Sequence, residues 1–476
     1  MNYIILLTAS VILSAIFTNK FLKALGIPAL LTFLLLGMLF GSEGIFKIYF
    51  SDFSLAKELS SIALGFIIFY GGFCTKWKTA KPVIFQAGIL STLGAVSTAC
   101  LVCIFCRFIL NLDLYESFLI GAVICSTDAA SIFSILKAKR LNLKENTGSL
   151  IEIESGSNDP MSYVLVILAI TLIQGQSAGF VFILFIKQIV IGILIGLVLS
   201  HCAIFVFKKT HIITDGNDSL FIIALVLAGY AIPEIFNGNQ FLALYILGII
   251  LGNIDIDNKV SMMHFFDGLT KLAQIGIFFT LGLLANPSEI PKILWTGSLI
   301  FLFLSIIARP LTVWLLLSPF KSSKGQILLT SWAGLRGVAS IVFAIIAMDR
   351  VTLNYDLFHL VFLISILSVA IQGSFLPYIA QKTNMIDNFY DIKKTFNDYE
   401  EECAIKFMRV TVPPNHEWIG KRIRDITFPQ NALVLIIKRG NNRLMPKNHT
   451  KIKEGDRITL TLPSDLIYNI EHEQIS

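Results

Sequence analysis

The sequence predicts an all-α polytopic membrane protein of about 13 transmembrane helices, with inverted repeats and crossed broken helices, followed by a small cytoplasmic α/β domain. Three observations predict this fold class. Only 15% of the 476 residues are charged and 55% are hydrophobic, whereas soluble domains carry about 25% charged residues. Apolar runs long enough to cross a bilayer recur over residues 1–381, and some are interrupted by polar residues. Beyond residue 405 the pattern changes to short alternating strands.

The membrane domain is expected over residues 1–381. A helix needs about 20 apolar residues to cross the hydrocarbon core. Such runs centre near residues 10, 35, 66, 95, 126, 160, 195, 226, 246, 275, 303, 337 and 367. The first run has no basic stretch before it and no small-residue cleavage site after it, so we interpret it as a first span and not as a removable signal.

Basic residues in the short connections predict the orientation. They gather after odd-numbered spans, for example at Lys76, Lys78 and Lys81, and they are scarce after even-numbered spans. Because lysine and arginine accumulate on the cytoplasmic side, the N-terminus is expected outside and the C-terminus in the cytoplasm. The basic residues are not interleaved with aromatic side chains in the way that indicates nucleic-acid binding, so no nucleic-acid partner is predicted.

Two further segments follow the membrane domain. Residues 382–405 are polar and rich in Lys, Asp and Glu, which predicts a linker. Residues 406–476 are expected to form a small α/β module with a short helix around Gly420 and Ile423. Its expected strands are Lys406–Val412, Leu433–Lys438 and Arg457–Leu462.

The fifth predicted span carries Ser126, Thr127 and Asp128 at its centre. Ionisable residues at this depth are costly and indicate a functional site by default. A carboxylate beside two hydroxyl groups predicts a broken helix whose carbonyl groups could bind a cation. The alternative is an aspartate that pairs with a neighbouring helix for structural reasons alone.

The sixth predicted span contains Glu154, Ser155, Asn158 and Asp159. Helical spacing places Glu154 beside Asn158, and Ser155 beside Asp159. Asp159 and Ser155 then present hard oxygen ligands, which suit a monovalent cation. Pro160 removes one backbone donor and frees a carbonyl group nearby. The alternative is a helix cap, but an earlier Thr-Gly-Ser segment is a better cap and leaves Asp159 two or three turns deep.

The twelfth predicted span contains Arg336 between Gly334 and Gly337. An arginine at mid-membrane needs a counter-charge, and Glu154 is the expected partner, which leaves Asp159 to bind ions. The fifth and twelfth spans cross the membrane in opposite senses and both are interrupted. Matching broken helices of this kind mark the binding sites of secondary transporters.

At these residues the chain resembles the monovalent cation/proton antiporter-1 family, and in particular its bacterial NhaP-type potassium or sodium/proton antiporters. The resembling motifs are STDAAS at 126–131, EIESGSNDP at 152–160 and GLRGVAS at 334–340. They fall in order in the expected spans, and the general similarity covers roughly residues 1–385. Near the C-terminus, Trp418–Lys421 and Ile452–Arg457 resemble the TrkA C-terminal (RCK-C) regulatory module.

The resemblance implies roles for the polar residues of the two spans. Asp159 would hold a proton or a cation in turn. Asn158 would replace the second acid of electrogenic relatives and would bond to Thr127. Asp128, Ser155 and the Thr127 backbone would complete the cation site.

The resemblance also implies a buried stabilising pair of Glu154 and Arg336, a homodimer, and a small-molecule or nucleotide ligand at the RCK-C-like module. One position departs from the family pattern. Many relatives carry an acid before the paired glycines of the third span, where this chain has Tyr70 before Gly71 and Gly72. The departure bears on cation preference.

The predicted function is antiport of a monovalent cation, K⁺ in preference to Na⁺, for H⁺ across a bacterial cytoplasmic (inner) membrane, for cation and pH homeostasis. Asn158 in place of an acid predicts electroneutral, one-for-one exchange. No enzymatic activity and no cofactor are expected. The alternatives are an Na⁺-selective antiporter of the same family and a cation/solute symporter. A K⁺ channel would need TVGYG-type filter loops, and an intramembrane aspartyl protease a Gly-x-Gly-Asp motif; the sequence has neither.

Overall fold

The structure is a computed structural model of the chain. It describes residues 9, 13–14, 29–50, 52–139, 141–210, 217–254, 256, 259–387, 405–414, 416, 418–426, 433–439 and 442–463. The chain divides into two compact units, Met1–Asn397 and Asp398–Ser476. The expected span centred near residue 10 lies outside the described residues, apart from residues 9, 13 and 14, and so does most of the expected linker.

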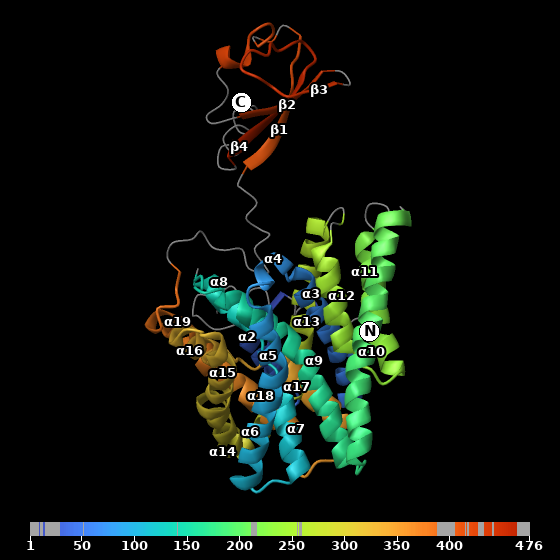
Figure 1. Cartoon of the computed structure of the whole chain (residues 1–476), viewed down its shortest axis with the longest axis vertical. Helices are drawn as coiled ribbons and strands as arrows, with labels where there is room; N and C mark the ends of the chain where they lie inside the picture. Colours follow the sequence, from blue (N-terminus) through green and yellow to red (C-terminus); the bar gives the residue numbers. More distant parts are fainter. Residues whose placement is uncertain are drawn as a thin grey trace. The chain divides into compact units, whose positions relative to one another are not determined.

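Helices make up almost all of the first unit (Figure 1). The first are α2 (Ala29–Phe40), α3 (Phe53–Cys74), α4 (Trp77–Ala80), α5 (Ile84–Ile89), α6 (Ala95–Phe108) and α7 (Leu114–Ile124). The next are α8 (Ala129–Ala138), α9 (Thr147–Ile173), α10 (Ala178–Phe205), α11 (Asp218–Ile235), α12 (Gln240–Asn253) and α13 (Lys259–Leu284). The last are α14 (Ile290–Phe303), α15 (Arg309–Leu317), α16 (Lys324–Trp332), α17 (Val338–Arg350), α18 (Leu357–Leu367) and α19 (Gly373–Lys382).

Short turns of other helix types extend these helices. The π-helical turns that continue α5, α10, α14 and α18 are η1 (Leu90–Gly94), η2 (Val206–Thr210), η4 (Leu304–Ala308) and η6 (Ser368–Gln372). The 3₁₀ turns before α14 and after α15 are η3 (Pro287–Glu289) and η5 (Ser318–Phe320). Several helices begin at a side chain that accepts a hydrogen bond from an N–H of the first turn, as capping predicts. These caps are Asp52, Asp113, Ser177, Asn239, Ser323 and Asp356.

The described helices confirm a mostly helical membrane fold. In the described part of the chain, nine helices are long and apolar enough to cross a membrane, and two shorter apolar helices lie at Leu31–Phe40 and Gln240–Asn253. Every expected span centre from residue 35 to residue 367 falls within a helix, or in the gap between α7 and α8 or between α16 and α17. The sequence pattern therefore located the apolar helices correctly.

The helices form two groups. Helices α2, α3 and α10–α13 pack mainly against one another, and so do α5–α9 and α14–α19. In Figure 1, α10, α11 and α12 lie at the right and α14, α15, α16 and α19 at the left. The two groups meet where α9 and α17 pack against α12 and α3.

Helices α3 and α12 approach closely because both carry glycine at the contact. A Cβ atom on Gly72 would lie 2.5 Å from the carbonyl oxygen of Tyr245, and one on Gly248 would lie 2.2 Å from that of Phe69. Small residues allow such close packing between membrane helices. Gly72, which follows Tyr70 and Gly71, therefore has a packing role in the contact between α3 and α12.

The second unit is a four-stranded antiparallel sheet in the order β1-β4-β2-β3. Its strands are β1 (Ile405–Thr411), β2 (Leu433–Arg439), β3 (Asn442–Leu444) and β4 (Arg457–Pro463). The three expected strands are therefore confirmed, and β3 is an addition that is too short for a sequence pattern to reveal. In place of the expected short helix is the 3₁₀ turn η7 (Ile423–Asp425), and the described residues of this unit contain no α-helix.

Candidate ion-binding site

Two interrupted helices cross at the centre of the first unit. Helix α7 ends at Ile124 and α8 begins at Ala129, while α16 ends at Trp332 and α17 begins at Val338. The backbone N–H of Asp128 donates a hydrogen bond of 2.8 Å to the carbonyl oxygen of Leu335, which joins the two non-helical segments. The expected breaks in the fifth and twelfth spans are thus both present, and they lie against each other.

Each charged residue at the crossing compensates the end of a helix. The Nη1 of Arg336 donates to the carbonyl oxygens of Cys125 at 2.8 Å and Ser126 at 2.6 Å, just beyond the C-terminus of α7. The carboxylate of Asp128 accepts from the N–H groups of Ala130 and Ser131 in the first turn of α8. A cation at a helix C-terminus and an anion at an N-terminus both stabilise groups that lack helical partners.

The partner of Glu154 differs from the one expected. Its Oε2 accepts a hydrogen bond of 2.8 Å from Nη2 of Arg309, and the two side chains are 2% and 3% exposed. The predicted Glu154–Arg336 ion pair is therefore wrong. Arg336 is engaged by the carbonyl groups at the end of α7, and α15 supplies the buried counter-charge instead. Arg309 lies inside a long apolar stretch, and an arginine there is the signal that sequence reasoning missed.

Asp159 lies on α9 beside the break between α7 and α8. The hydroxyl of Ser126, which is 1% exposed, donates a hydrogen bond to Oδ1 of Asp159, and the Asp159 residue is partly exposed. From the sequence, Ser126 was predicted only as a hydroxyl group near Asp128, and its contact with Asp159 was not predicted. Ser126 reaches the carboxylate because residues 126–128 are not helical and lie beside α9.

Asn158, Ser155 and Thr127 form a buried network next to Asp159. The Nδ2 of Asn158 donates to Thr127 Oγ1 at 2.6 Å, and the Thr127 N–H donates to Asn158 Oδ1 at 3.3 Å. The hydroxyl of Ser155 donates to the Thr127 carbonyl oxygen at 2.5 Å. The structure thus brings together Asp159, Asn158, Ser155 and Thr127, whereas the carboxylate of Asp128 is directed to the start of α8.

The donor set at the crossing consists of a carboxylate, hydroxyl groups and a backbone carbonyl. Such hard oxygen ligands suit alkali-metal cations, and transition metals prefer imidazole or thiolate. Among the described residues, no group of three or more His, Cys, Asp or Glu side chains could hold a metal ion. The arrangement can therefore hold either a proton or an alkali cation at Asp159.

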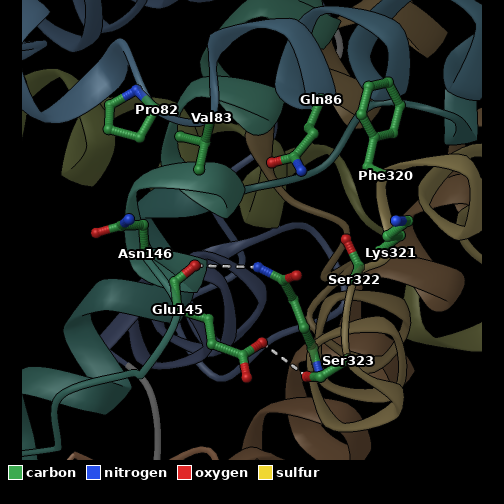
Figure 2. Close-up of a pocket in the computed structure, with 10 residues that line it drawn as sticks. Pro82, Val83, Gln86, Glu145, Asn146, Phe320, Lys321, Ser322 and Ser323 are labelled. Atoms are coloured by element: carbon green, nitrogen blue, oxygen red, sulfur yellow. Dashed lines mark hydrogen bonds between the residues drawn. The ribbon is translucent and has the colours of Figure 1, made fainter.

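A separate cavity of about 270 Å³ lies at the start of α9 (Figure 2). Its lining residues are Pro82, Val83, Gln86, Glu145, Asn146, Phe320, Lys321, Ser322, Ser323 and Gln326. The Ser323 hydroxyl donates a hydrogen bond of 2.7 Å to the Glu145 carboxylate (Figure 2), and the Gln326 amide donates one of 3.1 Å to the Glu145 carbonyl oxygen. None of the predicted site residues lines this cavity.

Two families match the chain. The sodium/hydrogen exchanger, transmembrane family matches residues 8–382, and the TrkA-C domain matches residues 407–472. Among curated relatives, the K⁺/H⁺ antiporter NhaP2 of Shewanella sp. (strain MR-4) is 32% identical over 460 residues, which cover 95% of this chain and 79% of that protein. The K⁺/H⁺ antiporter NhaP of Alkalimonas amylolytica is 31% identical over 96% of this chain and 80% of its own length.

A more distant relative and a solved structure are also similar. The Na⁺/H⁺ antiporter NhaH of Halobacillus aidingensis is 28% identical over 65% of this chain and 77% of its own length. The structure of the sodium proton antiporter MjNhaP1 from Methanocaldococcus jannaschii at pH 8 superposes with a TM-score of 0.69, at 24% identity, over 80% of this chain and 98% of that chain. This likeness establishes the fold.

Proposed function

The chain belongs to the sodium/hydrogen exchanger, transmembrane family and is a cation/proton antiporter, and we propose that it exchanges K⁺ for H⁺ one for one at the carboxylate of Asp159. One observation carries this proposal: a partly exposed aspartate on α9 accepts a hydrogen bond from Ser126 at the crossing of two broken helices. A proton and a cation exclude each other at one carboxylate. Alternating access then couples their opposite movements.

The preference for K⁺ is supported by the relatives. Those that match more than nine-tenths of the chain at 31–32% identity are named K⁺/H⁺ antiporters, and the named Na⁺/H⁺ antiporter matches 65% of it at 28%. An Na⁺-selective antiporter and a cation/solute symporter are the alternatives. Proton release by K⁺ alone, without any solute, would separate exchange from symport.

One-for-one exchange is supported by the charges around Asp159. Its neighbour Asn158 is neutral and bonded to Thr127, and Glu154 is paired with Arg309. A single carboxylate that carries one H⁺ or one K⁺ moves no net charge in a cycle. In this proposal the cation site at Asp159 is completed or supported by Thr127, Asp128 and Ser155. Asn158 holds the site in place. The crossing of the two broken helices is stabilised by Arg309 and Arg336.

The finer architecture belongs to the same proposal. We infer about 13 spans in inverted repeats, a membrane domain at 1–381, a linker at 382–405 and a regulatory domain at 406–476 that binds a small molecule or nucleotide. The protein is proposed to be a homodimer in a bacterial inner membrane, with its N-terminus outside and its C-terminus in the cytoplasm. The match to the TrkA-C domain over residues 407–472 supports the regulatory role.

The function can be tested in everted membrane vesicles whose lumen is acidified and whose internal pH is followed with a pH-sensitive dye. Addition of K⁺ should release protons, Na⁺ should do so less effectively, and clamping the membrane potential at different values should leave the rate unchanged. Asp159→Asn should abolish the release by either cation. The matched control is Asp52→Asn, because asparagine caps a helix as well as aspartate does. Full exchange by the Asp159 variant would refute the proposal.

A further inference from the structure

A partly exposed stripe leads along α9 towards Asp159. Glu152, Gly156 and Asp159 are each partly exposed, whereas Ile153, Glu154, Ser155 and Asn158 are buried. Residues separated by three or four positions share one face of a helix, so these three lie in a row. Glu152 and Gly156 precede Asp159 on the side of the bundle where α9 begins. The function described above has no role for either.

A buried hydroxyl group faces this stripe from the other helical group. Tyr245 on α12 is 5% exposed, and in the described part of the chain its hydroxyl oxygen has no hydrogen-bond partner within 3.5 Å, with the Thr75 and Ser157 side chains as its polar neighbours. A Cβ atom on Gly156 would lie 3.1 Å from the ring and 3.4 Å from this oxygen. Glu152 lies four residues before Gly156 and Asp159 three residues after it on the same face of α9, so the two carboxylates flank this contact. Buried polar groups normally have a partner, so this one indicates a ligand.

The carbonyl group of Gly156 also lacks its helical donor. In an α-helix it would accept from the N–H of residue 160, but Pro160 has no N–H. Gly156 is partly exposed, and its position on α9 faces Tyr245. Gly156, whose carbonyl group lacks this helical donor, thus packs against the ring and the hydroxyl group of Tyr245.

Glu152 adds a carboxyl group beside this contact. No hydrogen bond or ion pair reaches its carboxylate among the described residues, and Lys76 is the charged group that acts on it. Glu154, two positions along, is in contrast fixed by Arg309. Glu152 is one helical turn from Gly156 and two turns, or about 10 Å along the axis, from Asp159.

We propose that these groups form a second cation site, the approach site, made of the Glu152 carboxylate, the Gly156 carbonyl and the Tyr245 hydroxyl. It binds the transported alkali cation, still partly hydrated, before the cation reaches Asp159. This inference rests on the proposed function. Because α9 and α12 belong to different helical groups, the site is complete only while the two groups have the present arrangement. It serves the face at which α9 begins, the cytoplasmic face in the proposed orientation.

The test compares Glu152→Gln and Tyr245→Phe with the wild type in everted and right-side-out vesicles. Glu152→Gln should raise the K⁺ KM about fivefold to tenfold when K⁺ is presented to the cytoplasmic face. Its maximal rate should change little. Tyr245→Phe, which removes the hydroxyl group, should raise the K⁺ KM about twofold to threefold. The double variant should resemble Glu152→Gln, because both groups bind the same ion. KM at the opposite face should not change.

Glu145→Gln is the matched control, because it removes a carboxylate at the same end of α9 but in the separate cavity of Figure 2. It should keep the wild-type KM. An unchanged KM in Glu152→Gln, equal KM changes at both faces, or a loss of maximal rate alone would overturn the approach site. Asp159→Asn separates a failure of the approach site from a failure of the exchange mechanism. If Asp159→Asn is inactive while Glu152→Gln behaves as wild type, the approach site is refuted and the exchange mechanism stands.

Discussion

Asn158 and Thr127 are joined by hydrogen bonds in both directions. The amide nitrogen of Asn158 donates to the Thr127 hydroxyl at 2.6 Å, and the Thr127 backbone N–H donates to the Asn158 side-chain oxygen at 3.3 Å. Both residues are buried. The pair fixes the break between α7 and α8 to the middle of α9, next to Asp159.

Asn158→Leu should therefore lower both stability and exchange. Leucine has a similar size but leaves the buried Thr127 N–H without a partner, at a cost of about 1–3 kcal/mol, and it removes the donor to the Thr127 hydroxyl, which keeps its hydrogen bond to Ser155. The melting temperature in detergent and the exchange rate in vesicles measure the two effects. Asn217→Leu is the control, since Asn217 is exposed and its side chain caps no helix. Wild-type melting and exchange in the Asn158 variant would contradict this account.

Removal of either member of the Glu154–Arg309 pair should destabilise the protein strongly. Both side chains are almost fully buried, so Glu154→Gln or Arg309→Met leaves a charge without its counter-ion, at a cost of about 3–5 kcal/mol. The double variant Glu154→Leu/Arg309→Met should melt at a higher temperature than either single variant. Loss of the exposed Asp267–Lys271 pair should cost under about 1 kcal/mol and provides the comparison. A double variant no more stable than the singles would argue against the pairing.

Gly337→Ala should disrupt the crossing of the broken helices. A Cβ atom at this position would lie 2.4 Å from Oδ2 of Asp128, and the contacting atoms belong to a side chain that is fixed at the start of α8. We expect a lower melting temperature and loss of exchange. Gly276→Ala on α13 is the matched control, because a Cβ atom there meets nothing within 4 Å. Equal behaviour of the two alanine variants would refute the steric argument.

The C-terminal sheet should lose stability at low pH through Asp456. Burial raises the pKa of this carboxyl, but two hydrogen bonds of 2.8 Å from Arg439 and one from the Lys453 N–H outweigh burial and hold the pKa below its usual value. A carboxyl with a lowered folded pKa contributes stability above its unfolded pKa of about 3.9, and the contribution is lost as the pH falls through the folded pKa.

Asp456→Asn places an amide against the Arg439 donors and should reduce the protection of β4 from hydrogen exchange in the full chain, by about 2 kcal/mol at pH 6. The difference from the wild type should stay constant down to about pH 5 and shrink below about pH 4. Asp425→Asn, an exposed acid of the same unit, is the control. A difference that did not depend on pH would show that the charge of Asp456 is not responsible.

Local sequence alone was enough to predict much of this protein. Runs of apolar residues set the positions of the helices, because only a continuous helix satisfies its backbone polar groups in lipid. The polar residues at 126–128 and the glycines around Arg336 predicted both breaks, since they weaken a helix where they occur. The i, i+4 rule placed Glu154 beside Asn158 on α9, where a hydrogen bond of 3.3 Å joins their side chains.

Only the tertiary structure decided which groups from different helices meet. Arg309 and Arg336 both lie in apolar stretches, and the sequence does not say which one reaches Glu154. Ser126 reaches Asp159, and Tyr245 reaches Gly156, only because of how α9 packs against the broken helix and against α12. The pattern along one helix fixes which residues share a face, but contacts between helices depend on their packing, and a linear sequence does not encode those distances.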